Sequence, residues 1–172
     1  GCTLQGSVPE DDVIWLASLC AEAGADEVGL SDTTGMANPA QVRRLFTRLR
    51  AELGTKAGAA HMHNTRGLGL ANCLAAYDVG VRTFDASLGG LGGCPYAPGA
   101  SGNVCSEEIV HALQLMGYDT GVDLTRLVAA AQRLPALIGR DIPSQIVKAG
   151  QRLTLHPVPA DFEAIRERAL AR

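Results

Sequence analysis

KAGAAHMHNTRG, residues 56–67, is the segment on which the expected fold depends most. Alanine and glycine are poor strand formers, so propensity alone does not predict a strand here. Its position does, because a helical pattern capped by Asn38 precedes it and a helix expected over residues 68–77 follows it. Residues i and i+2 of a strand point to the same side, so His61 and His63 would face one spot. A His-x-His pair by itself is weak evidence for a metal site, so the interpretation depends on the residues around it.

Two similar segments flank this strand along the chain. ADEVGLSD (residues 25–32) and VRTFDAS (residues 81–87) each follow a helical pattern, and each carries an aspartate near its end. Strands that alternate with helices over short connections favour a parallel βα architecture, either a barrel or a doubly wound sheet. In both folds the chemistry lies at the carboxyl ends of the strands. Asp32, both histidines and the loop after Ser87 fall at those ends.

Further helices are marked by residues typical of helix starts: Ser7 with Glu10 as a capping box, Asn103 or Ser106, and Asp123. Pro135 would end or kink the helix that follows Asp123, and a last helix is expected over residues 161–171. Only about three strands can be read, whereas a complete eight-stranded barrel takes about 250 residues. The chain is therefore either a smaller open sheet or one part of a barrel.

The composition excludes several classes of protein. The chain has 172 residues, 47% of them hydrophobic, and a formal net charge of −3, which gives no basic surface for nucleic acid. No apolar run is long enough to cross a membrane. The five cysteines are an odd number without a Cys-x-x-Cys pair, so a reducing compartment, the cytoplasm, is expected.

The loop SLGGLGGCPYAPGASGN, residues 87–103, is the most informative stretch for function. Six glycines surround Cys94, so the loop can close over a ligand and its backbone can approach that ligand closely. The competing interpretation is a mobile surface loop with an exposed thiol. The residues of the loop alone leave both interpretations open.

Three motifs together resemble the 3-hydroxy-3-methylglutaryl-CoA (HMG-CoA) lyases. The glycine-rich loop is similar to their active-site signature, HMHNTRG to their second metal motif, and LSDTTGMANP to the loop before it. The resemblance implies the carboxyl-terminal part of a (β/α)8 TIM barrel, an α/β fold whose parallel strands alternate with helices, beginning near the end of the fifth strand. Residues 1–142 would form the second half of the barrel domain, and residues 143–172 a tail with a helix.

The resemblance also implies a set of site residues. His61, His63 and Asn103 correspond to ligands of a divalent metal, Mg²⁺ or Mn²⁺. Cys94 corresponds to the catalytic cysteine, and Asp32 to an acidic residue that contributes to catalysis.

Three features depart from the family pattern. Asn64 and Arg66 replace residues of the common lyase form His-x-His-Asp-Thr-Tyr-Gly, and Glu108 stands where several members carry aspartate. The first-strand Arg-Asp pair of the family has no counterpart, because RDG occurs nowhere in this sequence. The chain as given is therefore expected to leave the metal site incomplete and to be inactive alone.

The function implied for the parent protein is metal-dependent cleavage of HMG-CoA, or of a close 3-hydroxyacyl-CoA, to acetyl-CoA and acetoacetate. Cys94 would act as the general acid or base, because a thiol can protonate the acetyl-CoA enolate. The expected partners are an acyl-CoA and either a second copy, as a dimer, or an amino-terminal half outside this sequence. Two alternatives stay open: a Claisen-type synthase of the isopropylmalate or homocitrate kind, and an inactive half-barrel that acts as an assembly fragment.

Overall fold

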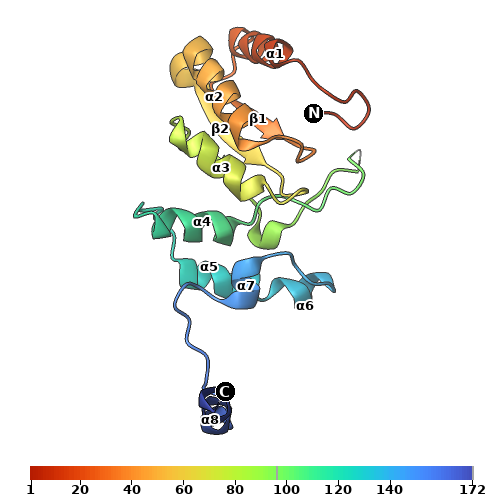
Figure 1. Cartoon of the computed structure of the whole chain (residues 1–172). Coiled ribbons are helices and arrows are strands. Elements are labelled where there is room, and N and C mark those ends of the chain that lie inside the picture. Colours follow the sequence, from red (N-terminus) through yellow and green to blue (C-terminus); the bar gives the residue numbers. More distant parts are fainter. Residues whose placement is uncertain (96, 172) are drawn as a thin grey trace.

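The computed structural model describes residues 1–95 and 97–171 and contains one three-stranded parallel sheet (Figure 1). The strands β1 (Val28–Asp32), β2 (Ala57–Met62) and β3 (Phe84–Asp85) lie side by side in sequence order. In this register Ser31 lies beside His61, and His61 lies beside Asp85. The predicted parallel order is therefore confirmed.

The third strand is much shorter than the predicted span of residues 81–87. Beyond Asp85, the place beside β2 is taken by residues that return from the glycine-rich loop. Val104 donates its backbone N–H to the carbonyl of Met62, and Ser87 donates to the carbonyl of Val104. The returning segment thus separates the two strand ends and stops the pairing of β2 with β3.

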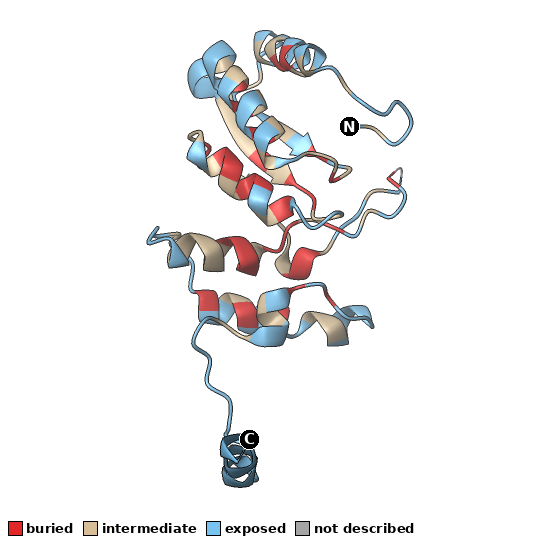
Figure 2. Cartoon of the chain, in the orientation of Figure 1, coloured by how far each residue is buried: buried red, intermediate tan, exposed pale blue. Residues whose placement is uncertain are grey.

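Three helices pack against the sheet and against each other: α1 (Glu10–Glu22), α2 (Pro39–Leu53) and α3 (Gly69–Asp78). The main cluster of buried side chains lies between the sheet and the helices α1, α2 and α3, and it extends to α4 (Ser106–Leu115), which packs against α3 (Figure 2). The largest core side chains are Phe46 and Leu49 of α2 and Met62 of β2. The short 3-10 turns η1 (Gly54–Lys56) and η2 (Leu88–Gly90) complete this part of the chain.

Helix ends confirm some of the predicted caps and correct others. Asn38 caps α2 by accepting a hydrogen bond from the Gln41 N–H, as the sequence predicts. The predicted capping box at Ser7 is wrong, because α1 begins after Pro9 without a side-chain cap, and the Glu10 carboxylate pairs instead with Arg44.

The start of α4 corrects a second cap. This helix begins after Cys105, so neither Ser106 nor Asn103 caps it. The amide of Asn103 instead donates to the Leu91 carbonyl at 2.8 Å. The next helix, α5 (Leu124–Ala131), does have its predicted cap at Asp123.

The last third of the chain consists of short helices. Pro135 lies in the first turn of a new helix, α6 (Leu134–Ile138), and α7 (Gln145–Ala149) packs against α4 and α5. The last helix, α8 (Phe162–Leu170), lies at the end of an extended segment and has no buried residue (Figures 1 and 2). Packing continues past residue 142 to α7, and the domain boundary predicted there stays a prediction.

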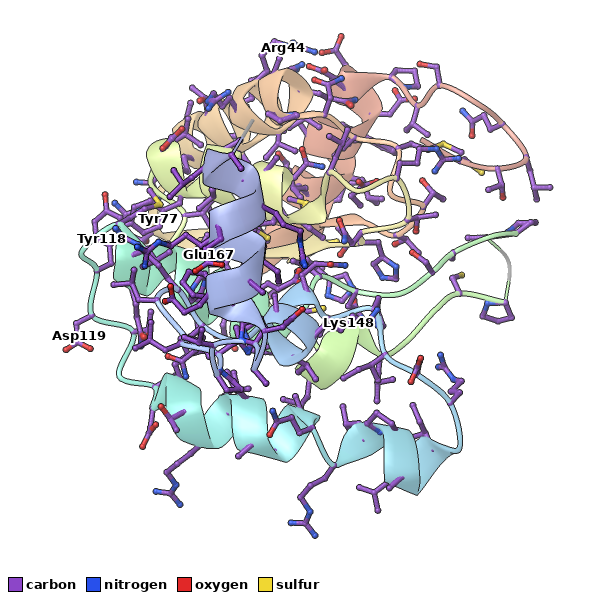
Figure 3. The ribbon with its side chains drawn as sticks, turned by 60° about the horizontal axis from the view of Figure 1, so that its bottom comes forward. Arg44, Tyr77, Tyr118, Asp119, Lys148 and Glu167 are labelled. Atoms are coloured by element: carbon purple, nitrogen blue, oxygen red, sulfur yellow. The ribbon has the colours of Figure 1, made fainter. Side chains whose placement is uncertain are left out.

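An aromatic cluster lies near the amino-terminal end of β3. Tyr77 of α3 and Tyr118, after α4, lie side by side with ring centroids 4.6 Å apart (Figure 3). The Arg82 guanidinium lies 4.2 Å from the Tyr77 ring centroid. Across residues 1–95 and 97–171, none of the helices is long and apolar enough to cross a membrane.

Candidate active site

His61, in β2, and His63, directly after β2, point to the same side of the sheet. Alternation along the strand turns both imidazoles to one side, and their Nε2 atoms lie 3.2 Å apart. Met62, between them, points the other way into the core and is 2% exposed. The sequence expectation about the direction of these side chains therefore agrees with the structure.

His63 lies in an environment that favours its neutral form. Its side chain is buried, and burial lowers the pKa of the imidazole, with a further lowering from the nearby His61. The carboxylate of Asp32 opposes both effects by favouring the protonated ring. The net direction is a lowered pKa, which leaves the imidazole neutral and able to donate a lone pair near neutral pH.

Asn103 reaches the histidines through the returning arm of the glycine-rich loop. Residues Asn103 and His63 form an antiparallel bridge, and Asn64 donates its N–H to the Gly102 carbonyl at 3.0 Å. Residues directly opposite in such a pair turn their side chains to the same side. The Asn103 Oδ1 atom is buried and, among the described residues, has no hydrogen-bond partner.

These three residues fit part of a divalent metal site. Adjacent ligands about 2.1 Å from an octahedral Mg²⁺ ion lie about 3 Å apart, close to the spacing of the two Nε2 atoms. The unpaired Asn103 oxygen supplies an oxygen donor beside them. Within the described residues there is no cluster of three or more His, Cys, Asp or Glu side chains placed to hold a metal. The chain therefore offers two imidazole nitrogens and one amide oxygen, and a complete coordination sphere needs further ligands.

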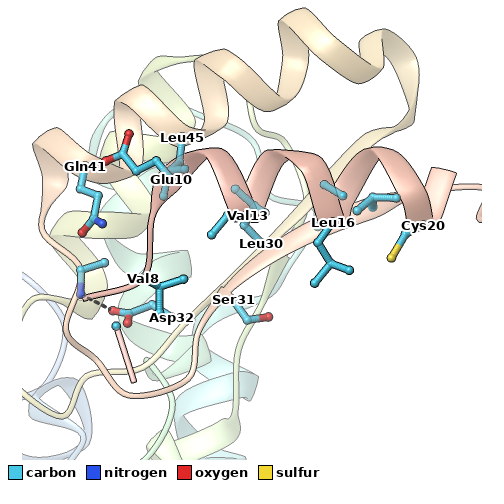
Figure 4. Close-up of a pocket in the computed structure, with 15 residues that line it drawn as sticks. Val8, Glu10, Val13, Leu16, Cys20, Leu30, Ser31, Asp32, Gln41 and Leu45 are labelled. Atoms are coloured by element: carbon cyan, nitrogen blue, oxygen red, sulfur yellow. Dashed lines mark hydrogen bonds between the residues drawn. The ribbon is translucent and has the colours of Figure 1, made fainter. Parts of the chain in front are cut away.

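Asp32 lies at the end of β1, where it organises the following loop. Its two carboxylate oxygens accept the backbone N–H groups of Met36 at 2.9 Å and Ala37 at 3.1 Å. Figure 4 marks one of these bonds as a dashed line from the Asp32 carboxylate. The residue also lines a cavity of about 350 Å³ between α1 and β1. Among the described residues, neither histidine lines that cavity. The carboxylate is thus tied to its own loop, and its catalytic role stays a prediction.

Cys94 lies on the glycine-rich loop, which extends beyond the strand ends (Figure 1). Its thiol is free and partly exposed. The two arms of the loop meet at Gly102, where φ is +128° and a Cβ atom would lie 2.1 Å from the Gly90 carbonyl oxygen. Only glycine allows this contact, so the base of the loop is closed while Cys94 lies further out. The catalytic role of Cys94 stays a prediction, and the neighbouring residue 96 lies outside the described residues.

The structure adds two acidic residues that the sequence did not single out. Asp85 lies beside His61 in the sheet, and its Oδ2 atom lies 3.7 Å from His61 Nδ1. The sequence pattern that could have indicated Asp85 is the aspartate near the end of each of the two similar segments, residues 25–32 and 81–87. Glu107 is fully buried and accepts the Gly89 N–H at 3.1 Å, which holds the first arm of the glycine-rich loop. Glu108, in contrast, accepts the backbone N–H of Gln145 and so ties α4 to α7.

Comparisons with known proteins show which family the chain belongs to. The model of the HMGL-like family matches residues 1–134. The chain belongs to the HMGL-like family. It is 45% identical over 150 residues to the (R)-citramalyl-CoA lyase of Chloroflexus aurantiacus, covering 87% of this chain and 47% of that protein. It is 44% identical over 145 residues to the hydroxymethylglutaryl-CoA lyase YngG of Bacillus subtilis, covering 84% and 48%.

A solved structure of an HMG-CoA lyase shows the same arrangement of strands and helices. An HMG-CoA lyase from Acinetobacter baumannii, in complex with coenzyme A and 3-methylmalate, superimposes with a TM-score of 0.89 at 49% identity. The match covers 92% of this chain and 52% of that chain. The expected fold, a part of a TIM barrel, is therefore confirmed. The chain spans about half the length of the curated relatives it matches.

Proposed function

We propose that the protein containing this chain is a metal-dependent carbon–carbon lyase that acts on 3-hydroxyacyl-CoA thioesters. The first candidate substrate is HMG-CoA, with acetyl-CoA and acetoacetate as products. The observation that supports this proposal is the meeting of His61, His63 and Asn103 at the base of the loop that carries Cys94. The relatives are lyases, which favours cleavage over condensation.

In this proposal some residues of the chain bind a cation, and another transfers a proton. His61 and His63 would hold Mg²⁺ or Mn²⁺ through Nε2, and Asn103 through Oδ1. When bound, the cation supplies Lewis acidity that lowers the pKa of the substrate hydroxyl. The lowered pKa of His63 keeps its ring in the neutral form that such binding requires.

Cys94 would donate a proton to the acetyl-CoA enolate left by cleavage of the carbon–carbon bond, and the proton released from the substrate hydroxyl would restore the thiol, so that no net proton is gained or lost. A thiol is a much stronger acid than an alcohol, which makes the side chain suitable for this transfer. The glycines on both sides of Cys94 let the loop fold over the substrate and exclude water from the enolate. Asp32 would contribute by holding the neighbouring loop in place at the same edge of the sheet.

Steady-state kinetics of the full-length protein test this proposal, with HMG-CoA as substrate and Mg²⁺ or Mn²⁺ titrated. Cys94→Ser is expected to lower kcat by a factor of about 10² or more and to leave the cation dependence nearly unchanged, because a hydroxyl is far less acidic than a thiol. His63→Ala is expected to raise the cation concentration needed for activity. Cys20→Ser, in an exposed position on α1, is the matched control. Full activity of Cys94→Ser would show that the loop acts only as a cover.

A second candidate substrate is (R)-citramalyl-CoA. The relative named for that activity is 45% identical to this chain. Arg66 also adds an exposed positive charge at the same edge of the sheet, where its guanidinium donates to the Thr34 carbonyl at 2.8 Å. Comparing kcat/KM for the two thioesters, with acetyl-CoA release as the common readout, decides between them.

The five free cysteines support a reducing compartment, and we propose the cytoplasm.

A further inference from the structure

Three side chains form a continuous line across the ends of β2 and β3. Asp85 Oδ2 lies 3.7 Å from His61 Nδ1, and His61 Nε2 lies 3.2 Å from His63 Nε2. His61 and Asp85 are also direct neighbours in the sheet register. One nitrogen of His61 therefore faces a carboxylate, while the other faces the second histidine.

The position of one proton decides whether such a ring can bind a cation. A neutral imidazole carries a single N–H, and metal binding through Nε2 requires that this proton be on Nδ1. For His61, the carboxylate of Asp85 lies 3.7 Å from Nδ1, beyond hydrogen-bond distance, and its negative charge favours the proton on that nitrogen. For His63, the Nδ1 atom is buried and has no hydrogen-bond partner among the described residues. The two histidines are therefore not equivalent as ligands.

We propose that Asp85 is a positioning residue, which holds the Nδ1 proton and the ring orientation of His61 so that Nε2 is free for a divalent cation. The inference rests on the metal site of the proposed function. Asp85 lies on the Nδ1 side of the ring, away from the facing Nε2 atoms, so it acts through His61 and not as a ligand. Without Asp85, the His61 proton moves to Nε2, where it bonds to His63 and competes with the cation.

Mn²⁺ titration of the full-length protein without substrate, followed by calorimetry, tests the inference. Asp85→Ala is expected to raise the Kd for Mn²⁺ by about 10- to 100-fold, the usual effect of removing such a partner. Asp85→Asn keeps an oxygen that can accept the Nδ1–H, so a smaller rise is expected. Asp78→Ala is the matched control, because this exposed aspartate of α3 pairs with Arg43. It is expected to leave the Kd unchanged.

Nitrogen-15 NMR of the metal-free protein gives a second readout. His61 is expected to be protonated on Nδ1 in the wild type and to shift towards Nε2 protonation in Asp85→Ala. An unchanged Kd and an unchanged tautomer in Asp85→Ala, with Mn²⁺ binding lost in His63→Ala, would overturn the inference and leave the metal site in place. Unchanged Mn²⁺ binding in His63→Ala as well would overturn the metal site itself.

Discussion

At the scale of single residues, burial makes the thiols of Cys73 and Cys105 less reactive than an exposed thiol. Burial raises the pKa of the Cys73 thiol to about 12, and it also raises the pKa of Cys105. These two thiols are therefore held protonated and act as small core side chains. Cys94 is partly exposed on a glycine-rich loop, where a thiol can meet a substrate.

His63 gives a pH-dependent prediction at the same scale. In the metal-free protein its pKa is expected to lie below 6.5, because burial and the neighbouring His61 disfavour the charged ring. The unfolded chain then binds more protons than the folded chain between the lowered pKa and 6.5. Stability therefore rises with pH through that window, and this contribution is lost as the pH falls through it.

NMR titration of the His63 ring protons checks this expectation. His61→Ala should raise the pKa of His63 part of the way back towards 6.5, since burial remains as the larger cause. Asp32→Asn should lower it further, because the charge of Asp32 favours the protonated ring. A pKa at or above 6.5 in the metal-free wild type would contradict the assigned causes.

At the scale of secondary-structure elements, α7 and α8 have opposite relations to the body of the chain. Gln145 at the start of α7 donates its N–H to Glu108 at 2.7 Å, and Ser144 beside it is fully buried. Every described residue of α8 is exposed. Helix α7 is therefore expected to contribute to stability, and α8 is not. Truncating the full-length protein before each of these helices tests the difference.

Removing residues 161–172 is expected to change the free energy of unfolding by less than about 0.5 kcal/mol, as for exposed surface changes. Removing everything after residue 142 is expected to cost about 1–3 kcal/mol or more, because the buried Glu108 carboxylate loses its hydrogen-bond donor. Urea unfolding of both variants measures the difference. Equal stability of the two would support the predicted boundary at residue 142 and contradict a structural role for α7.

At the scale of the whole molecule, the sheet has two unpaired sides in the part of the chain that is described. Strand β1 pairs only with β2, and β3 pairs only with β2. The neighbouring α1 carries Trp15 at 64% and Leu16 at 57% exposure. Unpaired strand edges beside apolar surface favour association with another chain or segment.

Residues 1–172 expressed alone are therefore expected to self-associate, or to bind a co-expressed segment from outside this sequence. Sedimentation velocity over a range of concentrations measures this. Trp15→Lys, which removes apolar surface but leaves the strand edges, should reduce the association only in part. A monomer at all concentrations, with β1 amide protons protected from exchange, would contradict the expectation.

Features that depend on local pattern could be predicted from the amino-acid sequence. The cap at Asn38 and the direction of His61 and His63 follow from the chemistry of a helix start and the two-residue period of a strand. The parallel order of the strands follows from their alternation with helices. The roles predicted for the site residues come from the resemblance to the HMG-CoA lyases, because no local pattern assigns them.

Contacts between residues that are distant in the sequence depend on the three-dimensional fold. Asn103 reaches His63 because the returning arm of the loop pairs with the end of β2, and the same pairing shortens β3. Asp85 meets His61 through the register of two strands that are 24 residues apart at this point. Hydrogen bonds between such segments depend on how the strands are aligned, and neither propensity nor spacing in the sequence fixes that alignment.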